Sequence, residues 1–264
     1  MSDNSIINNL NRATSSIAKS FEKLSSGKRI NRASDDAAGL AIAASLDAVI
    51  KVNNQASRNI DYASSALQIA DSTIGQLSDI ATRQAELATQ SANGSLSDEQ
   101  RVQLDQEYQA LSQEAQRITS TTQFNGQNLF SSGSITIQAG SDGSSSSQLS
   151  VDFQNIQGIV DGRTSTSIAS QAGAQAAIDS TNDYISQLAT SRGSIGAVES
   201  RLSTASSNLS SQNVEYAKSK SRIEDVDYAE EVANKTASSI KQNSSVAVLA
   251  QANLAKESVL RLLS

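Results

Sequence analysis

The side chains of this 264-residue sequence most able to do chemistry are carboxylates, because the chain has no histidine and no cysteine. One acidic group is the adjacent pair Asp35 and Asp36. A larger cluster comprises Glu224, Asp225, Asp227, Glu230 and Glu231. Neighbouring carboxylates can share the roles of acid and base, or hold a divalent cation. This cluster lacks the alternating oxygen ligands of a calcium loop, and so does Asp142 with Gly143.

A helix start explains the acidic pair better than catalysis does. Ser34 is a good N-cap residue, and we expect Asp35 and Asp36 in the first helical turn, where the helix dipole favours anions. Without cysteine there is no disulfide, thiol nucleophile or zinc–thiolate site, and without histidine the commonest general base is missing. No nucleophile elbow or phosphate-binding glycine loop occurs. We therefore expect no catalysis, cofactor or metal. Detection of a metal bound to the purified protein would make an enzymatic function a candidate again.

The elements that carry these groups are expected to be long helices. The chain has no proline, where average usage would give about 13 in this length. One apolar series repeats in steps of four and three: Ala56, Ile60, Ala63, Leu67, Ala70, Ile74, Leu77 and Ala81. A second repeats every seven residues: Leu188, Ile195, Leu202, Leu209, Tyr216 and Ile223. Apolar groups at these spacings form a seam along one helix face that must be buried against other helices.

Composition and charge limit the remaining classes. Hydrophobic residues make up 38% and aromatic residues 3% of the chain, which suits an elongated bundle better than a sphere. The net charge of −6 offers no overall attraction to nucleic acid or anionic membranes. The first 34 residues are basic, which we interpret as a solvated helix face. The longest apolar runs, Ala37–Ala44 and Val246–Ala250, are too short to span a membrane, and the N-terminus has no secretory signal pattern.

Local signals divide the chain further. We expect a helix from about Leu40 to Ala92 and another after the capping-box pattern at Ser97. Asn125 and Gly126 predict a tight turn, and alternating apolar residues predict a β-hairpin of Ser134–Gln138 with Gln148–Phe153. Helical periodicity resumes near Ser167. The two strong arms can pair into one antiparallel bundle, with both chain ends at one pole and the β segment capping the other.

Both ends of the chain have an apolar helical face with no sufficient partner in one subunit. The expected packing residues at the N-terminus are Ile6, Leu10, Ile17, Phe21 and Leu24. Those at the C-terminus are Val248, Leu249, Val259, Leu260 and Leu263. Leaving a large apolar side chain in water costs about 1.5–3 kcal/mol. We therefore expect the ends to pair with each other, as a terminal coiled coil, or with other subunits.

Six stretches, in order along the chain, resemble the bacterial flagellin family. They are Leu24–Ala43, Gln90–Gly94, Thr122–Gly126, Gln171–Gln175, Ser221–Asp225 and Val248–Asn253. The departure lies in the middle, where many flagellins carry large outer domains and this chain has some forty Ser- and Gly-rich residues. The chain is similar to a short, core-only flagellin.

The resemblance implies a mainly α fold in five segments. Residues 1–34 and 225–264 would form the inner-core helices, 35–130 and 167–224 the outer-core bundle, and 131–166 a β-hairpin insertion. It also implies type III export, an extracellular location in the flagellar filament, and self-polymerisation into a helical homopolymer. The implied partners are the filament cap and hook-junction proteins and an export chaperone on the C-terminal segment.

The resemblance also implies a recognition surface for the animal Toll-like receptor that senses flagellin. The matching residues are Arg83 and Leu87, one helical turn apart, and Glu107 on the next helix. From the residues alone, Arg83 would form a surface pair with Asp79, Leu87 would pack in the bundle and Glu107 would be solvated. A flagellar junction or cap-type protein, which shares the terminal helices but forms only a short ring, is the alternative to a filament subunit.

Overall fold

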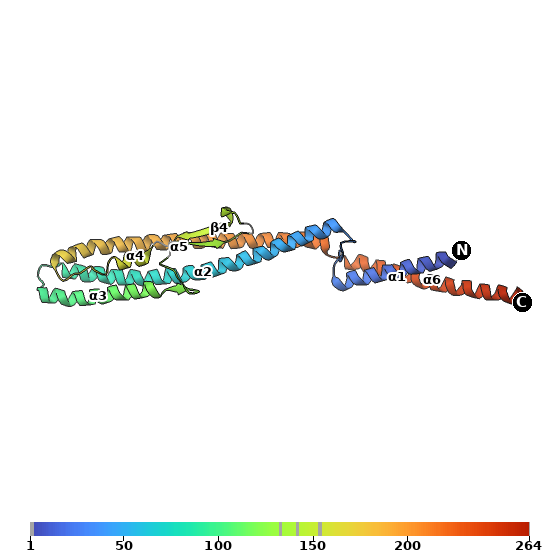
Figure 1. Cartoon of the computed structure of the whole chain (residues 1–264), viewed down its shortest axis with the longest axis horizontal. Helices are drawn as coiled ribbons and strands as arrows, with labels where there is room; N and C mark the ends of the chain where they lie inside the picture. The colour runs from blue at the N-terminus through green and yellow to red at the C-terminus, as the bar shows by residue number, and fades with distance from the viewer. Residues whose placement is uncertain (1–2, 132–133, 141–142, 153–154, 264) are drawn as a thin grey trace. The chain divides into compact units, whose positions relative to one another are not determined.

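The chain folds mainly into α-helices, and the computed structural model describes residues 3–131, 134–140, 143–152 and 155–263. Figure 1 shows the elements, which in chain order are α1 (Asp3–Ser26), α2 (Ala37–Ser91), α3 (Asp98–Thr121), β1 (Gln123–Phe124), β2 (Gln127–Asn128), β3 (Ser134–Gln138), the 3-10 turn η1 (Ser145–Ser147), β4 (Gln148–Asp152), α4 (Ile156–Asp161), α5 (Gln171–Glu224) and α6 (Tyr228–Leu263). The expected mainly α class with a small β-hairpin is confirmed. None of the described helices is long and apolar enough to cross a membrane.

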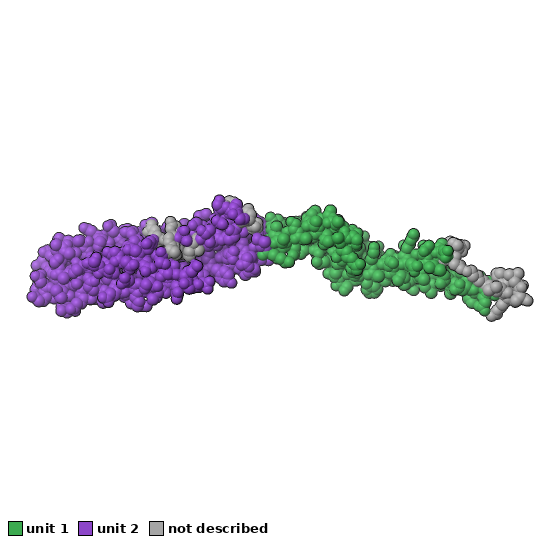
Figure 2. All heavy atoms as spheres, viewed as in Figure 1, with its two compact units in different colours: residues 1–51, 213–264 green, residues 52–212 purple. Residues whose placement is uncertain are grey.

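Two compact units divide the chain (Figure 2). The first unit comprises residues 1–51 and 213–264, and the second comprises residues 52–212. The first unit consists of two separate segments and the second of one, and α2 and α5 each contribute residues to both units.

The second unit has the heptad seams at its centre. Ile60, Leu67, Ile74 and Leu77 of α2 are buried in one cluster with residues of α5, which include Leu188, Ile195 and Leu202. The ion pair between Asp71 and Arg192 (2.9 Å) joins the two helices. The α2 seam and the α5 seam as far as Leu209 are therefore core, as the spacing predicted.

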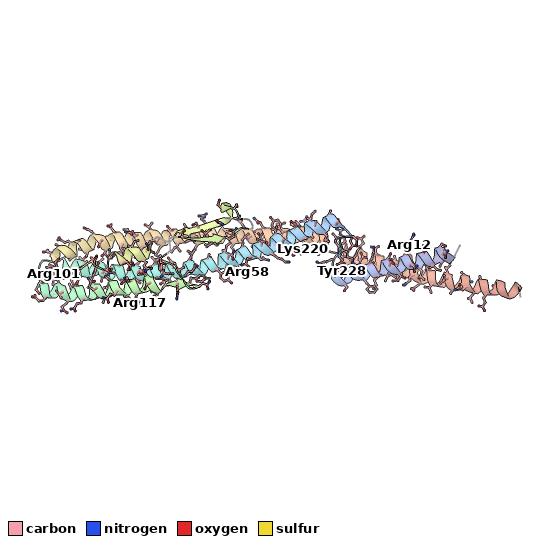
Figure 3. All side chains as sticks on the ribbon, in the orientation of Figure 1. Arg12, Arg58, Arg101, Arg117, Lys220 and Tyr228 are labelled. Atoms are coloured by element: carbon pink, nitrogen blue, oxygen red, sulfur yellow. The ribbon has the colours of Figure 1, made fainter. Side chains whose placement is uncertain are left out.

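α3 packs antiparallel to the end of α2 and begins with the capping box that the sequence predicted. The Ser97 side chain accepts the backbone N–H of Gln100, and the Gln100 side chain accepts the backbone N–H of Ser97. Arg101, labelled in Figure 3, donates to the carbonyl oxygens of Asn93 (2.9 Å) and Leu96 (3.2 Å). One arginine thus holds the short link between the two helices, which keeps them adjacent.

The two expected hairpins are present. Asn125 (φ 50°) and Gly126 (φ 79°) form the left-handed turn between β1 and β2, a conformation that Asn and Gly adopt most readily. β3 pairs antiparallel with β4, from Ser134 opposite Asp152 to Gln138 opposite Gln148. Phe153, expected in the second strand, lies outside the described residues.

The expectation that the β segment caps the end of the bundle is wrong. Ile137 and Val151 of the hairpin are buried in the same cluster as the α2 and α5 seams, so the hairpin lies against the sides of these helices (Figure 1). An alternating strand buries one face, and the side of a helix pair offers it a long apolar surface. The end of the bundle is closed instead by loops, where Gln171 donates to the carbonyl oxygen of Ala92 (3.2 Å).

Candidate assembly and recognition surfaces

The first unit contains an antiparallel pair of terminal helices, α1 and α6. Lys23 forms an ion pair with Glu231 (3.5 Å), and Gln242 donates to the hydroxyl of Thr14 (3.1 Å). Few apolar side chains are buried between the two helices, Ile6 and Ala13 being the clearest. Two helices can bury only one face each, so the remaining faces stay open.

Large apolar side chains lie on those open faces. The exposed residues are Ile7, Phe21, Tyr228, Val232, Ile240, Val246, Val248 and Leu254. Ile240 and Leu254 keep 61% and 62% of their surface accessible. Monomeric soluble proteins rarely expose large apolar patches, and such patches mark interaction surfaces, so these eight exposed side chains are candidates for contact with other proteins.

The predicted packing residues of α1 and α6 differ in how deeply they are buried. Ile6 is buried, while Leu10, Ile17, Leu24 and Leu249 are half-buried. Phe21 and Val248 are exposed, and the ammonium of Lys235 lies 4.1 Å from the centroid of the Phe21 ring. The backbones of Val259, Leu260 and Leu263 belong to α6, but their side chains lie outside the described residues.

The loop after α1 is held against the end of α5. Gly27 has a positive φ of 72°, and the Tyr228 hydroxyl would lie 3.2 Å from any added Cβ, so only glycine fits without strain. The backbone N–H of Arg29 donates to the carbonyl oxygen of Glu224 (2.6 Å), and that of Val226 donates to the carbonyl oxygen of Gly27 (3.1 Å). This short antiparallel contact joins the beginning and the end of the chain.

The acidic pair is used within the same loop, and the expected N-cap is wrong. α2 begins at Ala37, and the Asp36 carboxylate accepts the backbone N–H of Gly39 (2.8 Å), so Asp36 is the cap in place of Ser34. Asp35 accepts the backbone N–H groups of Arg32 (3.0 Å) and Asn31 (3.2 Å), and these bonds, that of Arg32 foremost, lower its pKa. The Asp35 carboxylate therefore stabilises the loop, and the Asp36 carboxylate caps α2.

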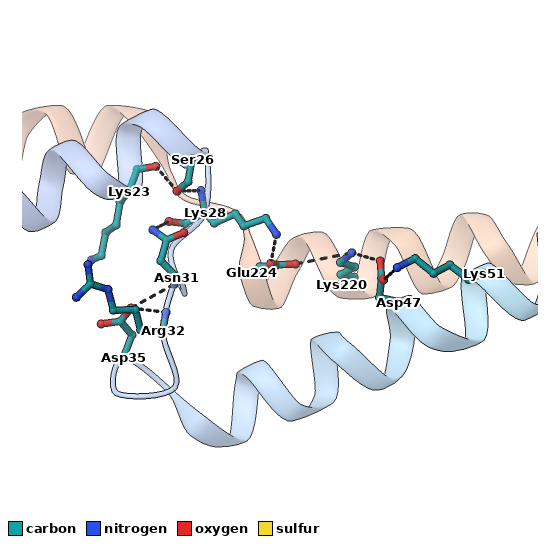
Figure 4. Close-up of polar contacts among 10 residues, drawn as sticks. All are labelled: Lys23, Ser26, Lys28, Asn31, Arg32, Asp35, Asp47, Lys51, Lys220 and Glu224. Carbon is teal, nitrogen blue, oxygen red and sulfur yellow. Dashed lines mark hydrogen bonds and ion pairs between the residues drawn. The ribbon is translucent and has the colours of Figure 1, made fainter.

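A chain of alternating charges follows from this loop along the facing helices (Figure 4). Lys28 pairs with Glu224, which also lies 3.9 Å from Lys220. Lys220 pairs with Asp47, and Asp47 pairs with Lys51 (2.7 Å). Hydrogen bonds from Lys220 first and Lys51 second lower the pKa of Asp47 to about 2. Sequence reasoning missed this chain, although Asp47–Lys51 and Lys220–Glu224 both have the i, i+4 spacing of helical ion pairs.

The rest of the acidic cluster is structural. Asp225 accepts the hydroxyl of Ser221 (2.6 Å), and Asp227 caps α6 by accepting the backbone N–H groups of Ala229 and Glu230. Glu231 pairs with Lys23. Among the described residues, no group of three or more potential ligands is placed to hold a metal ion.

The proposed receptor residues lie in the second unit, where the structure separates their roles. Arg83 donates to Glu107 (2.9 Å) and Glu86 (2.9 Å) on an exposed surface, and these bonds, that of Glu86 foremost, raise the pKa of Arg83. Leu87 is only 1% exposed and packs in a cluster with Tyr108 and Ile168. The expected pair of Arg83 with Asp79 is wrong, because Glu107 on α3 and Glu86 lie closer.

Comparisons with known proteins give the family. Residues 1–136 match the model of the bacterial flagellin N-terminal helical region, and residues 178–263 match that of the C-terminal helical region. Together the two models cover both terminal helices, the loop after α1 and the seams of α2 and α5. The fold and these matches define a structural protein built from paired terminal helices, not an enzyme.

Individual relatives support the same family as the two family models. The chain is 36% identical to a flagellin of Halalkalibacterium halodurans, over 93% of this chain and 91% of the relative. It is 36% identical to the flagellar filament 30.7 kDa core protein of Treponema maltophilum, over 92% and 91%. The crystal structure of Bacillus cereus flagellin matches 58% of this chain and 88% of its own, with a TM-score of 0.52 and 27% identity. This chain belongs to the bacterial flagellin family.

A further structural likeness concerns the fold alone. A putative flagellar hook-associated protein of Vibrio parahaemolyticus superposes with a TM-score of 0.61 over 72% of this chain, at 15% identity. This likeness is limited to the helical architecture, whereas the sequence matches are to flagellins.

Proposed function

We propose that this chain polymerises into the flagellar filament through its terminal helices, as an extracellular subunit that supports swimming. The observation that carries the proposal is the set of exposed apolar side chains on α1 and α6, which includes Phe21, Ile240 and Leu254. Burying such side chains against other copies is favourable by about 1.5–3 kcal/mol each. Residues 1–34 and 225–264 would form the inner core, 35–130 and 167–224 the outer bundle, and 131–166 the outward insertion.

Removing residues 245–264 tests this proposal. The deletion takes away Val246, Val248 and Leu254 but leaves the contacts of α1 with the first part of α6, so a soluble helical monomer should remain that forms no filaments. Electron microscopy and light scattering measure polymerisation, and circular dichroism checks the helices. The full-length chain under the same salt conditions is the control. Filaments formed by the deleted chain would show that the exposed apolar side chains of residues 245–264 are not needed for assembly.

Other partners belong to the same proposal. The filament cap and hook-junction proteins would meet the terminal helices at the two ends of the polymer. An export chaperone would cover the exposed apolar side chains of α6 before assembly, because apolar groups left in water favour aggregation. These partners rest on the family and on the open faces of α1 and α6.

A second function is favoured by the exposed polar group at Arg83. We infer that the monomer is a ligand of the animal flagellin-sensing Toll-like receptor, with Arg83 and Glu107 as the contacting residues. Their side chains meet at 2.8 Å on the surface of α2 and α3, where a guanidinium can bind further acceptors on a partner. Leu87 would support this surface from the core.

The receptor function is tested with the Arg83→Ala monomer. Its activation of the receptor should fall about tenfold, or 1.4 kcal/mol, because the charged contact is lost. Arg117→Ala is a matched control, since Arg117 is also an exposed arginine that pairs within its own helix, with Glu114. A wild-type monomer that does not activate the receptor would contradict the proposed receptor function. Equal activation by the Arg83→Ala and Arg117→Ala variants would contradict it as well.

A further inference from the structure

The β3–β4 sheet of the second unit has an open edge along β3. Among the described residues, β3 pairs only with β4, and β1 pairs only with β2, so the two hairpins do not join into one sheet. The register runs without a bulge from Ser134 opposite Asp152 to Gln138 opposite Gln148. The outer side of β3 therefore presents backbone groups that no described strand satisfies.

The hydrogen-bond pattern of the sheet identifies the residues that face this edge. The backbone N–H of Ala139 donates to the carbonyl oxygen of Ser147 (2.9 Å), its direct partner when the register is continued by one pair. Opposed residues of an antiparallel ladder alternate between pairs that exchange such bonds and pairs that do not. Ile137 therefore bonds to β4, whereas Thr136 and Gln138 turn their backbone N–H and C=O groups outward.

Contacts beside the edge agree with this orientation. Asn59 of α2 donates to the carbonyl oxygen of Gln138 (3.2 Å), so this edge acceptor already takes a donor from outside the sheet. Thr136 is exposed, and its backbone forms no hydrogen bond beyond the sheet with any residue that the structure describes. One N–H and one C=O at Thr136 are thus available to a further strand.

A groove of about 410 Å³ lies beside the same edge. Helix α2, the β1–β2 hairpin and β3 all contribute to its lining, which includes Tyr62, Ala66, Phe124, Gln127, Thr136 and Gln138. No charged residue lines it. The Tyr62 side chain keeps 61% of its surface accessible. The groove therefore offers an uncharged surface with an aromatic ring next to open backbone groups.

The edge also lacks the usual protection against strand pairing. Proteins commonly block an open edge with a charged side chain, a proline or a bulge. The strand Ser134–Gln138 has none of the three.

We propose that the β3 edge binds an extended, uncharged peptide segment of a partner protein, which adds as a strand beside Thr136 and places alternate side chains in the groove. In strand addition, backbone hydrogen bonds supply affinity and pockets for alternate side chains supply specificity. A charged side chain would lose water in this groove without gaining a counter-ion, so uncharged residues fit it best. The site belongs to the second unit and does not depend on the assembly proposed for α1 and α6.

Peptide binding to the full-length monomer tests the edge. The probe is a fluorescein-labelled, capped hexapeptide of alternating valine and threonine, and fluorescence anisotropy should show saturable binding. Thr136→Pro should weaken binding about tenfold, because proline removes the outward N–H but leaves the ladder bonds of Ile137. Thr136→Val, which keeps this N–H, should bind like the wild type. Ser150→Pro is the matched control, since Ser150 lies opposite Thr136 and faces the outer edge of β4.

Two methylated peptides separate strand addition from capture of side chains alone. N-methyl groups on the valines block the N–H groups along one edge of the extended peptide, and N-methyl groups on the threonines block the other edge. An added strand turns only one of these edges to β3. One methylated peptide should therefore bind like the parent peptide, and the other about tenfold more weakly.

Three results would overturn the proposal. They are no binding of the parent peptide at about 1 mM, equal affinities of the Thr136→Pro and Ser150→Pro chains, and equal affinities of the two methylated peptides. Circular dichroism and thermal unfolding check that both proline variants remain folded. Because all measurements use the monomer, none of these results bears on filament formation.

Discussion

Carboxylates that look reactive in the sequence serve the backbone in the structure. Asp36 and Asp227 each accept backbone N–H groups at a helix start, and Asp35 closes a loop in the same way. The first N–H groups of a helix have no partner within the helix, so a carboxylate beside them satisfies donors that would otherwise need water. Acidic residues gathered near helix starts are therefore weak indicators of catalysis.

Tyr184 shows the opposite case, a polar atom without a partner. The side chain is 2% exposed, and its hydroxyl forms no hydrogen bond within the part of the chain that the structure describes. Burial raises the pKa of Tyr184, while the charge of Arg163, 4.9 Å from the ring centroid, opposes this shift. A void of about 10 Å³ adjoins the ring.

Removing this hydroxyl should cost little. Tyr184→Phe should change the free energy of unfolding by less than about 1 kcal/mol, because no hydrogen bond is lost and a desolvated polar atom is removed. Tyr108→Phe is the matched control, since its hydroxyl accepts a bond from Arg163 (3.3 Å), and it should destabilise more. Urea denaturation followed by circular dichroism measures both. A larger loss for Tyr184→Phe than for Tyr108→Phe would contradict the assignment.

At the scale of elements, the loop after α1 is joined to α5 and α2 by the chain of charges from Lys28 to Lys51. Because Asp47 has a lowered pKa, its contribution to stability is fully present above its unfolded pKa of about 3.9 and is lost as the pH falls toward 2. The contact between α2 and α5 in the first unit should therefore weaken only in strong acid.

Lys220→Met tests this link. It removes the largest cause of the shift, so the pKa of Asp47 should rise toward its ordinary value, while Lys51 still holds it partly below. NMR titration of the Asp47 carboxyl carbon measures the change. Lys218→Met is the control, because Lys218 pairs with Glu215 on the same helix. An unchanged pKa of Asp47 in the Lys220→Met variant would show that Lys220 does not set it.

Local patterns in the sequence predicted the elements well where neighbours in the chain decide. The capping box at Ser97 and the Asn125–Gly126 turn depend on residues a few positions apart, and the β3–β4 pairing joins strands that lie close together in the sequence. The prediction of Ser34 as the N-cap of α2 is wrong because Ser34 and Asp36 are both suitable caps by type, and Asp36 caps the helix. The contacts of Asp35 with Asn31 and Arg32 decided the start of the helix.

At the scale of the whole molecule, the two family matches leave residues 137–177 uncovered, a stretch that includes β4 and α4. The polar loop at residues 140–147 lies within it. Long surface loops are altered at little cost in free energy, because closure entropy changes slowly with length. The assembly surface proposed for α1 and α6 lies in the other unit.

Replacing residues 140–147 with a two-residue turn should therefore preserve filament formation. Electron microscopy of the polymer and circular dichroism of the monomer measure the outcome. Ile137→Asp is the contrasting variant, since Ile137 is buried against the helices and its loss should unfold part of the second unit. Loss of filaments in a well-folded loop variant would show that the loop makes an essential subunit contact.

The periodic spacing of apolar residues, the absence of proline and six ordered motifs determined the helical class, the core seams and the family of this chain. These features depend on residue type and spacing alone. Only the tertiary structure decided which charges meet, because Lys28, Glu224, Lys220 and Asp47 come from three distant segments. Likewise, Leu87 and Arg83 stand one turn apart in sequence, yet α3 and α5 bury the first and leave the second open. Burial is a property of the packed neighbours, which a single helix pattern does not contain.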